Sequence, residues 1–102
     1  MDYLQTQINN YLEYCSTQKR LDEKTLKAYL IDLRQFSEGI TTIDLADITP
    51  ETLENYIAIL HKNYKPKTVK RKIASLKAFF HHLEYKDIID RNPFIHNLQT
   101  TR

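Results

Sequence analysis

Apolar residues recur every three or four positions along most of this chain, which is the period of an amphipathic α-helix. The first predicted helix runs from Asp2 to about Gln18. Its apolar stripe is Leu4, Ile8, Tyr11, Leu12 and Cys15. The second predicted helix has Asp22 as its N-cap and runs to Glu38, with Gly39 expected just beyond its end as a C′ residue. The stripe of this second helix is Leu26, Tyr29, Leu30, Leu33 and Phe36.

Prolines mark the starts of two further helices. Thr49 followed by Pro50 supplies an N-cap and a first helical residue, and Lys65-Pro66 repeats the arrangement. The third stripe is Leu53, Tyr56, Ile57 and Leu60. The fourth stripe is Val69, Ile73, Leu76, Phe80 and Leu83, flanked by Phe79. Asn92-Pro93 predicts the end of ordered helix near the C-terminus.

The stretch between the second and third helices, ITTIDLADI, is short and acidic. It predicts a connector whose Ile and Leu side chains cover the core. With one glycine and three prolines in 102 residues, the chain lacks the turns of a β-protein. The sequence therefore predicts a single all-α domain, a bundle of four main helices.

Charge is divided unevenly along the chain. Residues 35–61 contain five acidic residues and no Lys or Arg, whereas residues 55–83 contain seven basic residues and no acid. Such a separation concentrates positive potential on one element, as expected of a protein that binds a polyanion. The single cysteine, Cys15, lies on an apolar stripe, and no apolar run is long enough to span a membrane, so a cytoplasmic protein without a membrane partner is expected.

The outer face of the fourth helix carries cations separated by small residues. At 100° per residue the positions opposite its apolar stripe are Lys67, Thr68, Arg71, Ala74, Ser75 and Ala78, with Lys70, Lys77 and His82 in or beside the same sector. Small residues let a helix backbone approach a surface, so the pattern suits a helix in the major groove of DNA. We expect Arg71 to contact a base, and Arg71→Ala to weaken specific binding by about 1–3 kcal/mol. Lys67 and Lys70 are expected mainly on phosphates, with Thr68 and Ser75 able to bond either.

The second helix repeats this design over its first turns. Lys24, Thr25 and Lys27 are expected to face outward there, where backbone N–H groups also favour a phosphate. Asp32 is expected on the same face, where it would repel phosphate and limit contact to the first two turns.

Residue patterns that indicate catalysis are weak. The four histidines do not pair with Cys or a carboxylate at zinc-ligand spacing, and one glycine cannot form a glycine-rich phosphate loop. Cys15 fits a core stripe better than a nucleophile. We therefore expect no metal, no cofactor and no catalysis by this chain alone.

Three segments in order resemble the N-terminal core-binding domain of tyrosine recombinases, also called phage integrases. They are LDEKTLKAYLIDLRQF, DITPETLENYIAIL and KTVKRKIASLKAFFHHLEYKDIIDRNPF. The resemblance implies an orthogonal, SAM-like bundle over residues 1–94, followed at 95–102 by the start of an interdomain linker. It also implies a DNA clamp formed with a C-terminal catalytic domain, which would carry the tyrosine nucleophile, and tetramers on DNA.

In that family the start of the second helix and the first half of the fourth dock on the core recombination site of duplex DNA. By position, the resemblance implies the DNA contacts Lys24, Thr25, Lys27, Lys67, Thr68, Lys70, Arg71 and Ser75. Two alternatives without a recombinase parent stay open. One is a protein–protein interaction module whose basic face docks an acidic partner, and the other is a stand-alone helical DNA-binding regulator.

Overall fold

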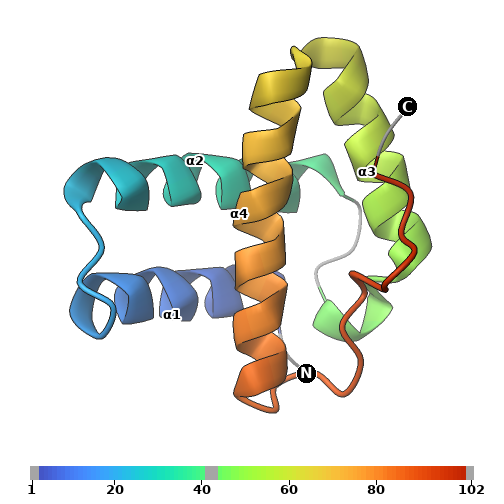
Figure 1. Cartoon of the computed structure of the whole chain (residues 1–102). Helices are drawn as coiled ribbons and strands as arrows, with labels where there is room; N and C mark the ends of the chain where they lie inside the picture. The colour runs from blue at the N-terminus through green and yellow to red at the C-terminus, as the bar shows by residue number, and fades with distance from the viewer. Residues whose placement is uncertain (1–2, 41–43, 101–102) are drawn as a thin grey trace.

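Residues 3–40 and 44–100 are described by a computed structural model, and within them the chain forms four α-helices and one short 3-10 helix (Figure 1). These are α1 (Leu4–Thr17), α2 (Glu23–Gly39), η1 (Leu45–Asp47), α3 (Pro50–Asn63) and α4 (Pro66–Tyr85). Over the same residues, extended pairing is confined to an isolated antiparallel bridge between Tyr3 and Asp44. The all-α prediction is confirmed.

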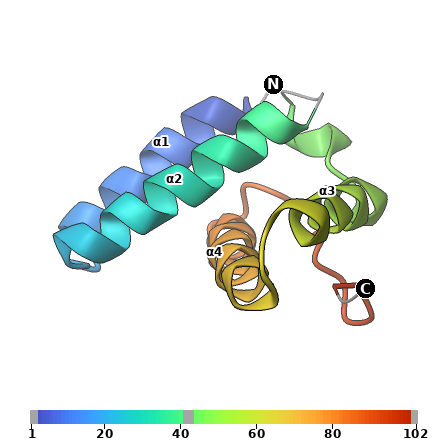
Figure 2. The ribbon, with the colours of Figure 1, turned by 90° about the horizontal axis from the view of Figure 1, so that it is seen from above.

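The helices form two antiparallel hairpins that pack across each other. α1 and α2 lie side by side, and α4 crosses both of them almost at a right angle (Figure 1). Seen along its axis, α4 lies against one side of the α1–α2 layer, next to α3 (Figure 2). The bundle is therefore orthogonal, as the resemblance implied, and its Cα radius of gyration of 13.0 Å is typical of a compact domain of this length.

The helix starts form as the sequence predicts. The Asp22 carboxylate accepts a hydrogen bond from the Thr25 N–H at 2.7 Å, and this bond lowers the pKa of Asp22. Thr49 and Thr52, on either side of Pro50, form a reciprocal capping box, and Pro66 occupies the first turn of α4. Local residue chemistry thus sets where α2, α3 and α4 begin.

The predicted apolar stripes meet in one core. Phe36 of α2 makes edge-on ring contacts with Tyr56 of α3 and Phe80 of α4, at centroid distances of 5.1 and 5.9 Å. Burial raises the pKa of Tyr56 to about 12. Leu45 and Ile48 are buried against this core, so the prediction that the connector covers it is confirmed for those two residues; residues 41–43 lie outside the described part of the chain.

The only glycine has a different role from the predicted one. Gly39 is the last residue of α2 rather than a C′ residue beyond it, and its φ is not positive. A Cβ added at this position would lie 2.7 Å from Cε1 of Tyr56. Close packing of the Tyr56 ring against the helix backbone therefore explains the glycine.

The fourth helix ends earlier than Asn92-Pro93 suggested. α4 stops at Tyr85, and Asp87 then adopts a left-handed conformation with φ 57°. The chain turns back and follows α3, where the Gln99 N–H donates to Glu54 Oε2 at 3.0 Å and His61 Nε2 lies 2.9 Å from the Thr100 carbonyl oxygen. Residues up to Thr100 are therefore held against the bundle, and a linker beginning at residue 95 stays a prediction.

Within the described residues, none of the helices combines the length and the apolar character that crossing a membrane requires.

Candidate nucleic-acid interface

The solvent-facing side of α4 carries a row of basic side chains. Lys67, Lys70, Lys77 and His81 are exposed and follow one another at spacings of three, seven and four residues, so they line one face of the helix. The exposed Ala74 lies between Lys70 and Lys77, which leaves the backbone accessible at the middle of the row. Thr68 is half-buried at the edge of this face.

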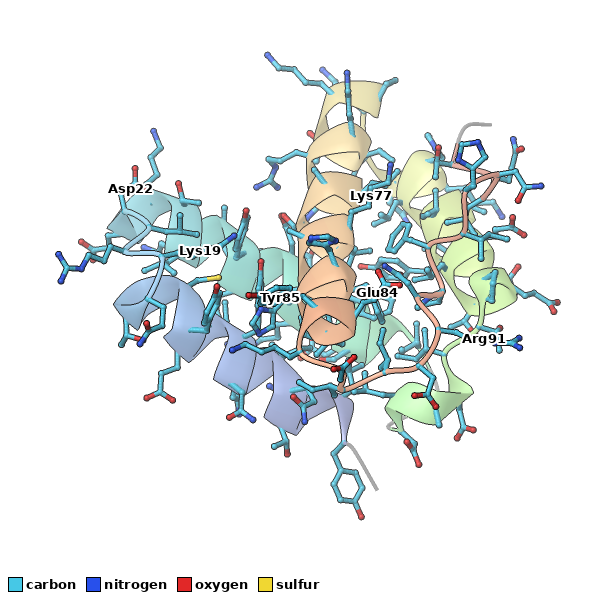
Figure 3. The ribbon with its side chains drawn as sticks, turned by 60° about the horizontal axis from the view of Figure 1, so that its bottom comes forward. Lys19, Asp22, Lys77, Glu84, Tyr85 and Arg91 are labelled. Carbon is cyan, nitrogen blue, oxygen red and sulfur yellow. The ribbon has the colours of Figure 1, made fainter. Side chains whose placement is uncertain are left out.

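A second basic segment lies at the start of α2. Lys24 and Lys27 are exposed, whereas Thr25 is half-buried with its N–H bonded to Asp22. Asp22 marks this end of α2, and Lys19 precedes it on the same tip of the α1–α2 hairpin (Figure 3). The capped N–H of Thr25 is no longer free for a phosphate, so the lysines are the positive groups of this segment.

Asp32 does not face solvent, so its predicted position is wrong. Its residue exposure is 2%, and its carboxylate is bonded to side chains of α4 where that helix packs on α2. Oδ1 accepts from Lys72 Nζ at 3.0 Å and Oδ2 accepts from the Ser75 hydroxyl at 2.8 Å. Because it is buried and neutralised, Asp32 does not present the repulsive charge on the outer face that the sequence suggested.

Lys72 is the buried partner of this carboxylate. Its ammonium also donates to Gln35 Oε1 and lies 4.9 Å from the centre of the Tyr64 ring. Among the described residues no buried side-chain nitrogen or oxygen lacks a hydrogen-bond partner. The ion pair is therefore fully satisfied, the condition under which a buried charge is tolerated.

Ser75 belongs to the same buried network. It is 3% exposed with its hydroxyl turned to Asp32, so the prediction that Ser75 lies on the outward face is wrong. Arg71, one turn earlier, lies at the edge of the network and is itself half exposed. Its Nη2 lies 3.3 Å from Asp32 Oδ1, while half of its side chain remains accessible to solvent. Of the predicted DNA contacts on α4, Lys67, Lys70 and Arg71 are exposed and Ser75 is not.

This crossing fixes the two basic segments relative to each other. Lys27 lies five residues, about 7.5 Å along the helix axis, before Asp32. Lys67 lies four residues, about 6 Å, before Arg71. Two short helical arms that diverge from one buried ion pair hold their lysines at a set separation and angle.

Where α4 crosses α1 the contact is aromatic. Tyr11 makes an edge-on contact with Phe79 at 5.5 Å, and the His82 ring lies 5.0 Å from Tyr11 and 4.4 Å from Tyr14. His82 is therefore half-buried rather than in the outward sector, and desolvation lowers its pKa. Burial raises the pKa values of Tyr11 and Cys15, which favours the neutral phenol and thiol over reactive anions.

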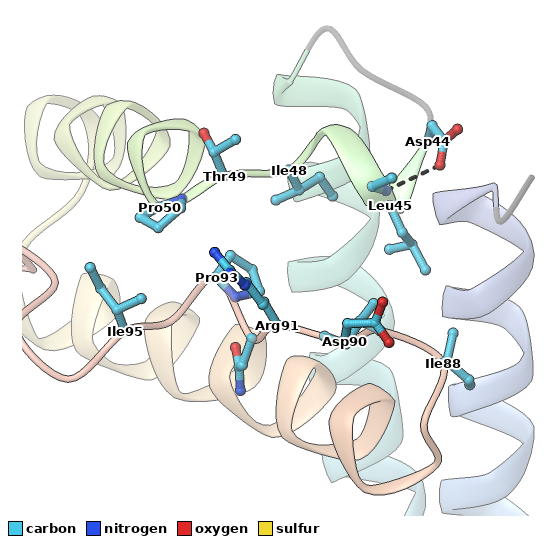
Figure 4. A pocket seen from close by; sticks show the side chains of 13 residues that line it. Asp44, Leu45, Ile48, Thr49, Pro50, Ile88, Asp90, Arg91, Pro93 and Ile95 are labelled. Carbon is cyan, nitrogen blue, oxygen red and sulfur yellow. Dashed lines mark hydrogen bonds between the residues drawn. The ribbon is translucent and has the colours of Figure 1, made fainter.

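A groove of about 560 Å³ lies elsewhere, between η1, the start of α3 and the chain after α4 (Figure 4). Its wall includes Asp44, Asp90 and Arg91, and the Asp44 carboxylate accepts from the Ala46 N–H at 3.1 Å. Two carboxylates on the wall make this groove unfavourable for a polyanion. Among the described residues, no group of three or more His, Cys, Asp or Glu side chains is placed to hold a metal ion.

The sequence carries a partial signal for the buried network, at Lys72 and Asp32 but not at Ser75. Lys72 follows Val69 by three residues and precedes Leu76 by four, so it lies on the apolar stripe of α4. Asp32 similarly lies four residues before Phe36 on α2. Opposite charges on two stripes are compatible with a buried ion pair, but only the tertiary structure shows that these two stripes pack together.

Comparison with known proteins gives the sequence relatives of this chain. Residues 8–86 match the family described as phage integrase, N-terminal SAM-like domain. A tyrosine recombinase of Agathobacter rectalis is 62% identical over 94 residues, which are 92% of this chain and 31% of that protein. The tyrosine recombinase XerC of Staphylococcus saprophyticus is 35% identical over 88 residues, 83% of this chain and 30% of that protein.

A tyrosine recombinase of Pseudothermotoga lettingae is 33% identical over 91 residues, 84% of this chain and 32% of that protein. The chain thus spans about a third of the length of the curated relatives it matches. No solved structure matches significantly.

Proposed function

The chain belongs to the phage integrase family as an N-terminal SAM-like domain, and from this premise we propose that it binds duplex DNA as the core-binding domain of a tyrosine-type site-specific recombinase. In this role it positions the recombinase on its core site during DNA integration or recombination. The catalytic domain of the same parent chain and the other protomers of a tetramer on DNA are its proposed protein partners.

One observation carries the proposal: two exposed basic segments diverge from a single buried ion pair. Lys24 and Lys27 lie on one arm, and Lys67 and Lys70 lie on the other. The phosphate backbone of DNA carries charge at regular intervals, so positive groups held at a set spacing can match it. Lysines on mobile loops would lose more conformational entropy on binding the same phosphates. Phosphate contacts of this kind fix the register of a protein on the duplex.

Arg71 is the proposed base-contacting residue. Its Nη2 lies 3.3 Å from Asp32 Oδ1, and half of its side chain is exposed to solvent. A guanidinium has five N–H donors, so the bond to Asp32 leaves donors free for a guanine edge. Asp32 then restricts the rotamers of Arg71 before DNA arrives, which lowers the entropy lost on binding.

Titration with a mixed-sequence 30-base-pair duplex at low salt tests the proposal. We expect the amide NMR signals of residues 24–28 and 67–71 to shift together. The double variant Lys67→Gln/Lys70→Gln removes two phosphate contacts, so the slope of log affinity against log salt should fall by about 1.8. Arg91→Gln/Lys86→Gln is the control, since Arg91 lines the groove beside η1 and the Lys86 ammonium lies 5.6 Å from the centre of the Tyr14 ring, so both cations lie outside the two basic segments.

Equal loss of slope in the two double variants would mean that net charge, not the α4 face, determines binding. Poly-glutamate provides the test of a protein partner. If it shifts the two segments and duplex DNA does not, the basic face docks an acidic protein and the DNA proposal is wrong.

A further inference from the structure

A second groove, of about 400 Å³, lies between α4 and the chain that follows it. Three of its lining side chains are basic: Lys77 and His81 from α4, and His96 from the C-terminal segment. Asn92 and Thr100 add further polar groups, and none of the carboxylates in residues 3–40 and 44–100 lines the groove. Lys77 leaves α4 on the side of this segment (Figure 3). The groove therefore offers cationic and neutral hydrogen-bond donors, the set that an anionic phosphate oxygen requires.

The segment that carries His96 is held in place. On its N-terminal side the Asn92 side chain donates to Glu84 Oε1 at 3.4 Å, and on its C-terminal side the Gln99 N–H donates to Glu54. Leu98, between these points, packs against the core. The carboxylates of Glu84 and Glu54 are engaged in these two contacts, and His96 stands opposite α4 on a fixed stretch of chain.

The groove lies at the far end of the basic row on α4. From Lys67 to His81 the helix advances fourteen residues, about 21 Å. The major groove of B-DNA is about 12 Å wide between its phosphate backbones. A helix whose first turn meets one backbone therefore extends far enough for Lys77 and His81 to meet the opposite one, with the small Ala74 over the groove between them.

We propose that Lys77, His81 and His96 form a phosphate site that holds the second DNA strand, so that α4 bridges the two backbones of the major groove. This inference rests on the proposed function and deepens it. It makes the C-terminal segment part of the DNA-binding surface rather than only a connection to the next domain. His81, for which the sequence offered no role, becomes a phosphate ligand.

The test uses the 102-residue chain and the same 30-base-pair duplex. Lys77→Gln should lower the salt slope by about 0.9, the value of one phosphate contact, whereas Arg91→Gln should leave it unchanged. Loss of two hydrogen bonds in His81→Ala/His96→Ala should weaken binding at fixed salt about fivefold to a hundredfold. The ring signals of His81 and His96 should shift at the same DNA concentration as the amides of residues 67–71.

Each outcome separates this inference from the proposed function. If the 67–71 amides shift while both histidine rings stay unchanged, DNA binds but the second-strand site is wrong. If neither group responds, the proposed function itself fails. Inorganic phosphate, without DNA, is the probe for a free anion. If it saturates the histidine shifts at the same concentration of phosphate groups as the duplex does, the groove binds a small phosphate and the bridging of two strands is wrong.

Discussion

α4 crosses α2 and α1 through two different kinds of contact. At α2 the contact is ionic, with Lys72 and Ser75 bonded to the two oxygens of Asp32. At α1 it is aromatic, with Phe79 against Tyr11 and His82 against Tyr14. The ionic crossing lies beside the basic segments proposed to meet DNA, and the aromatic crossing lies two turns further along α4.

The difference concerns directional precision. Apolar rings are stabilised mainly by the area they bury, so small changes of crossing angle cost little. A buried ion pair is stable only in a geometry that keeps its hydrogen bonds, and losing one partner costs several kcal/mol because a buried charge is left unpaired. We infer that the Asp32 network sets the angle between the α2 and α4 arms, while the rings supply cohesion. Three changes test this comparison, from the largest expected effect to the smallest.

Asp32→Ala leaves the Lys72 ammonium buried without its counter-ion, since the Lys72 side chain is 5% exposed. We expect the free energy of unfolding to fall by about 3–5 kcal/mol, measured by urea denaturation. Arg71→Ala is the matched control. It removes the half-exposed partner of the same carboxylate and should cost less than about 1 kcal/mol. A loss below about 1 kcal/mol for Asp32→Ala would show that the ionic crossing is not a strong constraint.

Phe79→Leu tests the aromatic crossing. The variant keeps an apolar side chain but loses edge-on contacts to Tyr11 at 5.5 Å and Phe80 at 5.2 Å. We expect a loss of about 1–2 kcal/mol in thermal or urea unfolding. Tyr85→Leu, at a site that is 72% exposed, should change stability by no more than about 0.5 kcal/mol. A cost for Phe79→Leu as large as that of Asp32→Ala would remove the proposed difference between the crossings.

The protonation of His82 gives the smallest effect. Burial, with Lys86, Lys19 and His81 nearby, lowers its pKa in the folded protein below the ordinary 6.5 that the unfolded chain retains. Stability from the neutral ring is therefore complete above about pH 6.5 and is lost as pH falls toward the folded pKa. The slope cannot exceed about 1.4 kcal/mol per pH unit, the value for one proton.

His82→Phe should remove this component, so the difference in unfolding free energy between the two proteins should vary with pH in that window and be constant above it. A difference that is constant throughout would show that the ring is protonated equally in both states.

Sequence periodicity predicted the helices and most of the core. Asp22, Pro50 and Pro66 set three helix starts through local hydrogen bonds and backbone restriction, so neighbours in the chain sufficed. The role of Gly39 was missed because the Tyr56 ring that requires it comes from another helix. The end of α4 at Tyr85 was missed because the following chain has no strong local stop before Asn92.

The basic character of α4 was likewise determined by the sequence alone, because charge and helical period are local properties. Which polar residues face outward was decided only by the tertiary structure. Projection at 100° per residue assigned Ser75 and Asp32 to the outer faces of their helices and gave Lys72 no role, yet all three lie buried at one crossing. The physical reason is that α4, which packs against all three other helices, is buried over more than its apolar stripe. A polar residue at the edge of the stripe becomes internal when a partner of complementary charge lies opposite, and only the crossing of α2 and α4 brings that partner within 3.0 Å.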